Sequence, residues 1–440
     1  MSSKSKKIAV VGAGYTGLAA AYELAKNGYS VDVYEASDAP GGLAGDFDIE
    51  GASIELAYHH IFTTDKYIIN LAKQTGSYKY LKWLDSSVAI YQHGKLYPFK
   101  TAIDLLKFKP LKLHNRIRAG IAVLYLQKYK QWQKLQGLTA VEWLNKYAGK
   151  QVYEVIWEPL LKGKFDKEYK HVSMAWLWAR VNTRANSREK GKGEQLGYFV
   201  GGFKVFTDGL AKACKKNGVR FFYNSKVNAL LKGPTVKTAA GQLKYDAVIV
   251  TAPTNIFWGL VNKSTPQGYL SDLKKVKYLD ALLLIFSSSQ ELTPYYWHNV
   301  NDKDIPFLVF INHTKLMDKK HYGNKNIYYI AAYLDKNSRY LKLDEKTLQA
   351  EWFKALRKMF PTFDKTRVSR AIKVHLKDAQ HIVDTKYSNY IPDIKTPING
   401  VYLSNFSQIY PEDRGTNFAI KAGQDVAKML HNDITNSLPE

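Results

Sequence analysis

The chain has 440 residues, 45% of them hydrophobic, with 64 Lys and Arg against 39 Asp and Glu. This length exceeds the usual single-domain range and supplies a sizeable core, which excludes a disordered protein or a peptide-sized binder. The formal net charge of +25 favours contact with phosphates, nucleic acid or anionic lipid, but charge alone does not choose among them.

A single cysteine, Cys214, excludes an internal disulfide framework and a cysteine-based zinc cluster, which suits a reducing, cytoplasmic location. Because it lies in an apparent helix, we interpret Cys214 as a small packing residue. The apolar part of residues 1–21 is interrupted by glycines, and no other apolar run approaches about 20 residues. We therefore expect neither export nor a transmembrane helix.

The first elements in chain order form a strand, a glycine-rich turn, a helix and a second strand. The apolar spacing predicts these at residues 8–11, 18–27 and 30–34, with the helix closing at Gly28. Further along, a helix at 205–217 precedes strands at 220–224 and 245–251. Near the end of the chain we expect a strand at 400–404 and a helix at 418–430.

Two intervening blocks have a different character. Residues 101–186 are expected to be mostly helical, whereas 280–390 alternates Tyr- and Val-containing runs typical of an antiparallel sheet. The sequence thus predicts an α/β protein with a Rossmann-like domain, interleaved with a substrate domain of antiparallel sheet plus helices. The Rossmann-like domain takes residues 1–75, 195–265 and 396–440; the substrate domain takes 76–194 and 266–395, with the helical excursion at 101–186.

The first turn has the spacing of a dinucleotide-binding site. Gly12 permits a tight turn, Gly14 allows the backbone to approach a pyrophosphate, and Gly17 allows close packing of helix on strand. Glu35 ends the next strand, where its carboxylate can accept hydrogen bonds from ribose hydroxyls. The strand, the helix, their spacing and the acid all agree, so we expect a nucleotide-binding site. Position 35 holds an acid and not a basic residue that could meet a 2′-phosphate, so we expect a nucleotide other than NADP.

A second glycine motif follows, Gly41-Gly42-Leu43, and with three later segments it resembles the superfamily of FAD-dependent amine oxidases, protoporphyrinogen oxidases and phytoene desaturases. The later segments are 201–203, 245–253 and 401–423. The resemblance implies an FAD cofactor and an oxidoreductase that acts on an apolar or lipid-linked small molecule. Leu43 stands where the family usually has a basic residue, and Ser404-Asn405 stands where it often has Gly-Asp.

The resemblance also implies which residues contact FAD. They lie in the two glycine motifs, beside the flavin ring and in the C-terminal segment that runs along it. The set is Gly12, Ala13, Gly14, Tyr15, Thr16, Gly17, Glu35, Gly41, Gly42, Leu43, His59, Val227, Asn405 and Asn417.

Other segments resemble UDP-galactopyranose mutases and define a second hypothesis, a flavin-dependent nucleotide-sugar mutase. They are residues 58–64, 94–99, 138–143 and the pair Arg180 and Arg184. The two arginines are four residues apart, share a helix face and are candidates to bind substrate by holding a nucleotide diphosphate. The C-terminal Arg- and Tyr-containing signature of those mutases is replaced here by residues 411–417.

His60 and Arg414 are the candidate catalytic residues. His60 lies where the superfamily places residues near the flavin ring, although a histidine beside an aromatic strand end is often a hydrogen-bonded core residue. Arg414 would stabilise a reduced anionic flavin or bind an acidic substrate; alternatively it pairs with Glu412 or Asp413 in a structural turn. Neither an H-x-x-x-H pattern nor a G-x-S-x-G pattern occurs, so we expect no metal and no serine hydrolase.

A basic amphipathic region at residues 100–136 raises the possibility of a peripheral membrane face. It contains nine Lys or Arg and one acid, Asp104. On a helix, an apolar face would form from Ile117, Ile121, Leu124, Tyr129 and Trp132. Such a face would lie on the anionic inner surface of a membrane, or else pack on its own domain while the lysines are solvated. No nucleic-acid motif accompanies the charge, so specific nucleic-acid binding is not expected.

Overall fold

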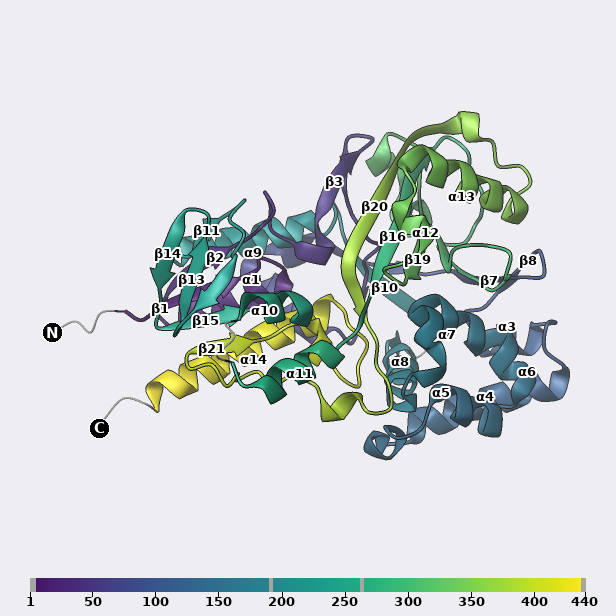
Figure 1. Cartoon of the computed structure of the whole chain (residues 1–440). Coiled ribbons are helices and arrows are strands. Elements are labelled where there is room, and N and C mark those ends of the chain that lie inside the picture. The colour runs from purple at the N-terminus through teal and green to yellow at the C-terminus, as the bar shows by residue number, and fades with distance from the viewer. Residues whose placement is uncertain (1–4, 190–192, 262–264, 437–440) are drawn as a thin grey trace.

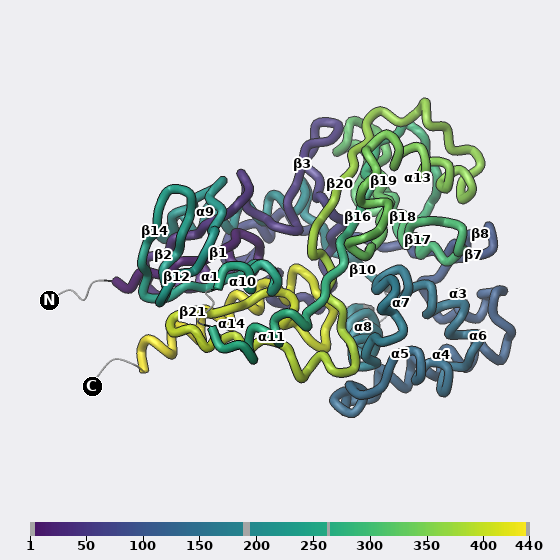
Figure 2. Tube along the Cα trace, viewed as in Figure 1, coloured from purple at the N-terminus to yellow at the C-terminus, as the bar shows by residue number. Residues whose placement is uncertain are grey.

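The computed structural model describes residues 5–189, 193–261 and 265–436; the basic start of the chain, through residue 4, lies outside this range. Figure 1 shows a sheet with its helices on the left, a second sheet at the upper right and a group of helices at the lower right. Figure 2 shows that the first strand and the last helix that the structure describes lie on the same side of the molecule.

The first sheet is parallel and its strands come from three distant parts of the chain. Lys7–Val11 (β1) is its central strand and carries the buried apolar run expected for a strand covered on both faces. Beside it lie β2 and β15, so that the strand order reverses at β1. The order is β11 (Arg220–Phe222), β2 (Ser30–Tyr34), β1, β15 (Ala247–Val250) and β21 (Val401–Leu403).

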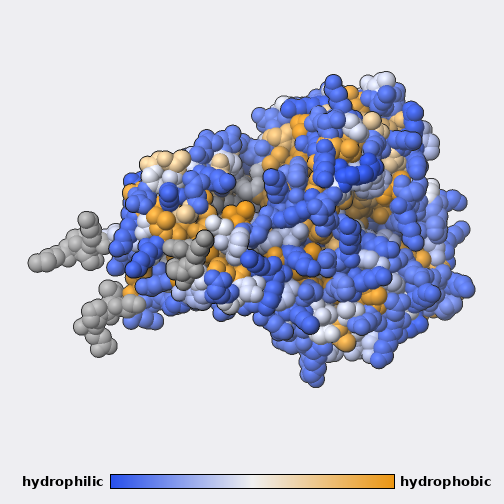
Figure 3. Space-filling model, in the orientation of Figure 1, coloured by the Kyte–Doolittle hydropathy of each residue, from blue (hydrophilic) through white to orange (hydrophobic). Residues whose placement is uncertain are grey.

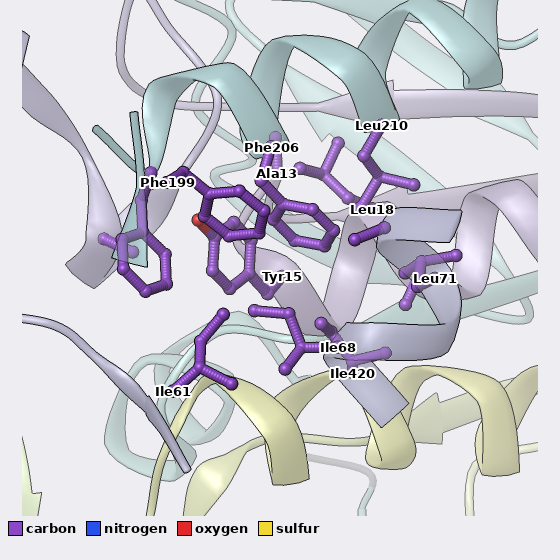
Figure 4. Packing of buried hydrophobic residues seen from close by; sticks show 14 of the residues in the cluster. Ala13, Tyr15, Leu18, Ile61, Ile68, Leu71, Phe199, Phe206, Leu210 and Ile420 are labelled. Atoms are coloured by element: carbon purple, nitrogen blue, oxygen red, sulfur yellow. The ribbon is translucent and has the colours of Figure 1, made fainter. Parts of the chain in front are cut away.

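Helices cover one face of this sheet and a small antiparallel sheet with a helix covers the other. Three long helices pack on the first face: α1 (Tyr15–Lys26), α9 (Lys204–Lys216) and α14 (Thr416–Thr435). The core beneath them includes Tyr15, Phe206 and Ile420, as Figure 4 shows. The other face meets β12 (Ala229–Leu231), β13 (Thr235–Thr238), β14 (Gly241–Lys244) and α10 (Thr254–Leu260).

The second sheet has seven strands and is mixed. Antiparallel pairing is found, as expected, among the strands of the 280–390 block. One parallel pair, β17 with β7, makes the sheet mixed, because β7 comes from a much earlier segment and a long connection joins it to β17. The order is β20 (Val368–His381), β16 (Tyr278–Ser288), β19 (Asn326–Leu334), β18 (Val309–Asn312), β17 (Trp297–Val300), β7 (Val88–Gln92) and β8 (Lys95–Pro98).

The helical excursion is confirmed and has its own core, centred on Trp176, Phe165 and Phe108. Two short π-helical stretches, Leu144–Ala148 and Tyr153–Trp157, interrupt its α-helices. Its helices are α3 (Ala102–Lys107), α4 (Leu113–Lys128), α5 (Ala140–Trp143), α6 (Lys150–Val152), α7 (Glu158–Phe165) and α8 (Met174–Asn186).

The remaining elements link these parts. They are β3 (Asp46–Ile49), β4 (Ala52–Glu55), β5 (Ile61–Phe62), β6 (Leu81–Asp85), β9 (Arg188–Glu189), β10 (Gly193–Phe199), α2 (Lys66–Thr75), α11 (Gln267–Lys275), α12 (Arg339–Lys342) and α13 (Glu345–Met359). Helix α13 lies in the upper right of Figure 1, beside the seven-stranded sheet.

The α/β class and the interleaving of a Rossmann-like sheet with a second sheet are confirmed, whereas the exact domain boundaries stay a prediction. Predicted ends differ from the structure by one to five residues: α1 begins at Tyr15 rather than 18, and α14 runs on to Thr435 rather than 430. Cys214 is fully buried against the carbonyl oxygen of Leu18, and burial raises the pKa of its thiol to about 12, as suits a packing residue. Among the described residues, no helix is long and apolar enough to cross a bilayer.

Candidate functional site

The glycine-rich turn between β1 and α1 meets the second glycine motif at the carboxyl end of the parallel sheet. Gly12 has a φ of +107°, and a Cβ there would stand 2.6 Å from Thr251 Oγ1. Gly42 has a φ of +59°, and its Cβ would stand 3.1 Å from Gly14 Cα. A bare backbone is therefore needed on both sides of the crevice, as it is where a pyrophosphate lies against a helix N-terminus.

Glu35 ends β2 at the same edge of the sheet. One carboxylate oxygen accepts a hydrogen bond from Ala13 N at 2.7 Å, and the other accepts from Ser37 N at 2.9 Å. These bonds fix the carboxylate beside the turn, at the point where the strand order reverses. Ligands of open parallel sheets bind in the crevice at this place.

A cavity of about 480 Å³ opens along the two glycine motifs. It brings together most of the residues that the sequence implied for cofactor contact, together with Arg414, which was singled out for catalysis. Those in its wall are Gly12, Gly14, Tyr15, Thr16, Glu35, Gly41, Gly42, Leu43, His59 and Val227. We call this space the nucleotide cavity.

Four residues of the implied set lie elsewhere. Ala13 donates its amide to Glu35 behind the cavity wall, and Gly17 packs on the Gly12 carbonyl. Asn405 is buried, donates to the Ala252 carbonyl and caps the turn that follows β21. Asn417 accepts hydrogen bonds from two amides at the start of α2. Contact with a cofactor stays a prediction for all four.

A second cavity, of about 210 Å³, adjoins the first. His59 and Arg414 line both, so the nucleotide cavity ends where the second begins. Its wall combines the aromatic side chains of Tyr58, Phe62, Trp297 and Tyr333 with charged groups: Lys164, Arg180, Arg184, Arg414, Asp65 and Asp413. We call this space the cationic cavity, because its four cations outnumber its two carboxyl groups.

Asp413 organises the basic side chains on one wall of the cationic cavity. Lys164 Nζ and Arg180 Nη1 each donate to its carboxylate at 2.7 Å. Burial alone would raise the pKa of the Asp413 carboxyl, but Lys164 and Arg180 hold it well below its usual value. Asp413 therefore stays ionised, and its two partners stay fixed at the cavity wall.

The Arg414 side chain does not make the local pair with Glu412 or Asp413 that was the alternative to a role in the site. Its guanidinium donates to Gln380 Oε1 at 3.1 Å and to the Tyr333 hydroxyl at 2.9 Å. Burial opposes ionisation of Tyr333, yet Arg414 and Lys164 lower the pKa of this phenol below its usual value. Arg414 and Lys164 thus stabilise the phenolate form of Tyr333 inside the cavity.

The two histidines are neutral at neutral pH. Burial lowers the pKa of His59 to about 4 and that of His60 to about 3. Their Nδ1 atoms lie 2.6 Å from the Ala57 carbonyl oxygen and 3.3 Å from the Tyr296 hydroxyl, respectively. His60 lines the cationic cavity but not the nucleotide cavity, so its catalytic role stays a prediction.

Sequence reasoning missed Lys164, Tyr333 and Asp65 as site residues. Nothing in the sequence distinguishes Lys164 from the other basic residues of a chain with 64 Lys and Arg. Tyr333 lies at the end of β19, among many aromatic residues of the block with the weakest motifs. Asp65 follows the histidine segment and is buried in the cavity wall, where burial raises the pKa of its carboxyl to about 7. Only Asp65 had a signal in the sequence, because it directly follows the segment 58–64.

A family model for flavin containing amine oxidoreductases matches residues 15–428. The chain belongs to this family. It is therefore a flavin-containing oxidoreductase, as the sequence resemblance indicated.

Proteins that are similar to this chain differ in the activities that their names give. Coproporphyrinogen III oxidase of Staphylococcus aureus is 26% identical over 290 residues, which are 58% of this chain and 62% of that protein. A protein of Exiguobacterium sp. 255-15 proposed as a protoporphyrinogen oxidase has a TM-score of 0.78 at 17% identity, covering 98% and 99% of the two chains. A reduced UDP-galactopyranose mutase has a TM-score of 0.77 at 16% identity, covering 97% and 96%. The two structural likenesses establish the fold, and the substrate has to be argued from the site.

Proposed function

We propose that this flavin-containing oxidoreductase binds FAD in the nucleotide cavity and oxidises, in the cationic cavity, a small molecule with an apolar body and at least one acidic group. The observation that carries the proposal is the position of four cations, Lys164, Arg180, Arg184 and Arg414, around the cavity that begins where the nucleotide cavity ends. The family membership supports a flavin, and the paired glycine turns and Glu35 fit the pyrophosphate and ribose of FAD.

The wall of the cationic cavity discriminates between substrate classes by charge. Aromatic side chains such as Trp297 and Tyr58 offer an apolar surface, and the nearby guanidinium groups offer donors for a carboxylate. A diamine would meet four like charges, and an uncharged polyene would make no ionic contact with any of them. A porphyrinogen with carboxylate side chains fits both features, which agrees with the described activity of the Staphylococcus aureus relative.

The residues of the chain have separable tasks in such a reaction. FAD, when bound, accepts a hydride from the substrate. A substrate that loses a hydride also loses a proton, and the phenolate oxygen of deprotonated Tyr333 would accept it, since Arg414 and Lys164 stabilise this phenolate. Arg184 orients the acidic group from α8, and Arg180, which Asp413 holds on the same face of this helix, adds positive charge beside it. The neutral histidines exclude water from the junction of the two cavities.

Anaerobic reduction of the flavin tests the proposal. The purified, FAD-loaded protein is mixed without oxygen with a carboxylate-bearing porphyrinogen, a polyene or a diamine, and flavin absorbance is followed. Bleaching by the acidic porphyrinogen alone is the expected result. Bleaching by the diamine or the polyene, with none from any acidic compound, would contradict the proposed substrate class.

The second candidate function is isomerisation of a nucleotide sugar, for which the specific observation is that Arg180 and Arg184 both line the cationic cavity. Against it, Arg180 is already engaged with Asp413. This function predicts that UDP binds and that Arg184→Ala weakens binding of UDP strongly. Unchanged binding of UDP in Arg184→Ala, measured by calorimetry, removes this candidate.

A further inference from the structure

Helices α3 and α4 present large apolar side chains to the outside of the protein. Seven of these side chains are between 48% and 62% exposed: Ile103, Leu106, Leu113, Ile117, Ile121, Leu124 and Tyr125. They form what we call the α3–α4 apolar face. Single exposed apolar residues are ordinary, but seven on two consecutive helices mark an interaction surface.

Helix α4 directs its large apolar side chains outward, whereas a helix that packs on its own domain directs them inward. Leu113, Ile117, Ile121 and Leu124 follow one another at spacings of four, four and three residues, so they share one face. The buried residues on the opposite side are smaller on average: Ala119, Ala122 and Leu126. The bulk of the apolar surface of α4 is therefore directed away from the core.

Two of the residues that the sequence assigned to this face belong elsewhere. Helix α4 ends at Lys128, and beyond it Tyr129 and Trp132 turn inward and pack against the helical core. Trp132 stacks on Trp178 with ring centroids 6.4 Å apart. The assignment is confirmed for Ile117, Ile121 and Leu124 and is wrong for the other two, because the helix ends before them.

Basic residues surround the apolar face. Lys107, Lys109, Lys112 and Lys128 are all exposed, and Lys128 continues the stripe four residues beyond Leu124. The single acid of residues 100–136, Asp104, accepts hydrogen bonds from backbone amides at the start of α3. The surface thus combines apolar side chains with positive charge, the pairing that anionic lipid headgroups and acyl chains complement.

We propose that the α3–α4 apolar face docks on the surface of an anionic phospholipid bilayer, with α4 lying in the plane of the interface. Its 16 residues extend roughly 24 Å, which suits a helix lying at the interface. A second copy of this chain fits the face less well, because a symmetric pair would bring the lysines of the two copies together.

The docking face lies one helix away from the cationic cavity. On α8, Asn182 Nδ2 donates to the Leu126 carbonyl at 3.1 Å and Trp178 Nε1 donates to the Tyr129 carbonyl at 2.8 Å. Arg180 and Arg184 of the same helix line the cavity. Docking would therefore hold the site close to the lipid surface, whatever substrate the site takes. Figure 1 shows α3, α4 and α8 together at the lower right, away from both chain ends.

Co-sedimentation with vesicles tests this proposal independently of any substrate. The full-length protein is mixed with phosphatidylcholine vesicles with or without phosphatidylserine. Binding is expected to the phosphatidylserine vesicles and to weaken as salt is added. The triple variant Ile117→Ser, Ile121→Ser, Leu124→Ser is expected to lose at least about tenfold in partitioning, since the bound area of apolar surface falls. The matched control carries Tyr78→Ser, Tyr80→Ser and Leu243→Ser, three exposed apolar residues outside the face, and keeps wild-type binding.

A double variant that removes two lysine charges separates the electrostatic contribution to vesicle binding from the apolar contribution. Lys109→Gln with Lys128→Gln is expected to weaken binding to phosphatidylserine vesicles about thirtyfold, because each basic residue near an anionic leaflet contributes about fivefold. Lys346→Gln with Lys354→Gln, on the exposed side of α13, serves as its control. Thermal unfolding checks that every variant is folded.

Three results would overturn the proposal. They are absence of wild-type binding to phosphatidylserine vesicles, an equal loss in the Tyr78, Tyr80 and Leu243 control, or a concentration-dependent dimer in sedimentation velocity that the Ile117 triple variant abolishes. The last result would assign the α3–α4 apolar face to a second copy of the chain.

Discussion

The two cavities of this protein are built by different means. The part of the nucleotide cavity beside Gly12 and Gly42 is formed by backbone at glycine turns, where main-chain amides also hold the carboxylate of Glu35. The cationic cavity is formed by long side chains from helices α7 and α8, strand β19 and the segment before α14. A backbone cavity is specified by local sequence, whereas a side-chain cavity exists only once distant segments have packed. The first kind suits a cofactor shared across a family, and the second suits a substrate that differs between members.

The largest effect, a loss of affinity for flavin, is expected from placing a side chain at the Gly12 turn of the nucleotide cavity. Gly12→Val places a branched side chain at a φ of +107° and within 2.6 Å of Thr251 Oγ1 at its Cβ. Affinity for flavin should fall on the order of 100-fold, with activity falling in parallel, because the turn must distort. The measurement is flavin content after purification and reloading. Gly268→Ala, with open space around it, is the control, and equal flavin content in the two variants would refute the role of the turn.

The next effect concerns proton transfer in the cationic cavity. Because the pKa of Tyr333 is lowered, its phenolate form becomes available as pH rises through that pKa, and the rate should rise with it. Tyr333→Phe should lower kcat about 100-fold and abolish this pH limb while leaving flavin content unchanged. Burial raises the pKa of Tyr58 well above its usual value, so Tyr58→Phe should keep the limb and displace it to higher pH, because the hydrogen bond with Tyr58 helps to lower the pKa of Tyr333. A Tyr333→Phe enzyme with the wild-type pH profile would exclude Tyr333 as the proton acceptor.

Substrate binding should respond more modestly. Arg184→Gln removes one charge from the cationic cavity and should raise KM for an acidic substrate about tenfold, the cost of losing a charged hydrogen bond. Flavin content and kcat should change little. Arg339→Gln, which affects a surface pair with Glu351, is the control. If KM rises equally for an uncharged compound, Arg184 acts through packing and not through charge.

The smallest effect is a shift in thermal stability. Burial raises the pKa of Asp65 to about 7 in the folded protein, so the folded state favours the protonated form. The sign follows from linkage: stability is highest below the unfolded carboxyl pKa and is lost as pH rises towards 7. Asp65→Asn should therefore have a Tm higher than wild type by roughly 2 °C at pH 8 and an unchanged Tm at pH 3.5. The exposed Asp48→Asn should show no such pH-dependent gain, and a gain equal to that of Asp65→Asn would contradict the assignment.

What could be predicted from the sequence follows the same division between backbone and side chains. Gly12, Gly14 and Glu35 are within 24 residues of each other and their spacing carries their geometry, so the first turn, its strand and its helix could be predicted. Arg180 and Arg184 were found through the resemblance of their segment to the mutases, together with their shared helix face. Tyr333 and Lys164 are 169 residues apart and meet only because α7 packs against β19. The sequence around neither residue carries a signal that the two side chains will be in contact.

Two assignments show how packing decides details that local patterns leave open. Asn405 was assigned to the cofactor because its segment resembles the family's segment that runs along the flavin, but its side-chain amide donates to the distant Ala252 carbonyl, so such contact stays a prediction. The alternative for Arg414, a local pair with Asp413, failed because Lys164 and Arg180 reach Asp413 from distant helices. In both cases the competing partner comes from a part of the chain that local reasoning does not see.

The central claim is that the two cavities form one site, with a flavin in the first and an acidic group bound in the second. The most direct measurement is a titration of the flavin-loaded protein with benzoate and, separately, with benzylamine, followed by the visible absorption of the flavin. These two ligands have similar apolar rings and opposite charges. The account predicts that benzoate perturbs the flavin bands, that this perturbation is weakened in Arg184→Gln, and that benzylamine leaves the bands unchanged. A perturbation by benzylamine with none by benzoate would contradict it.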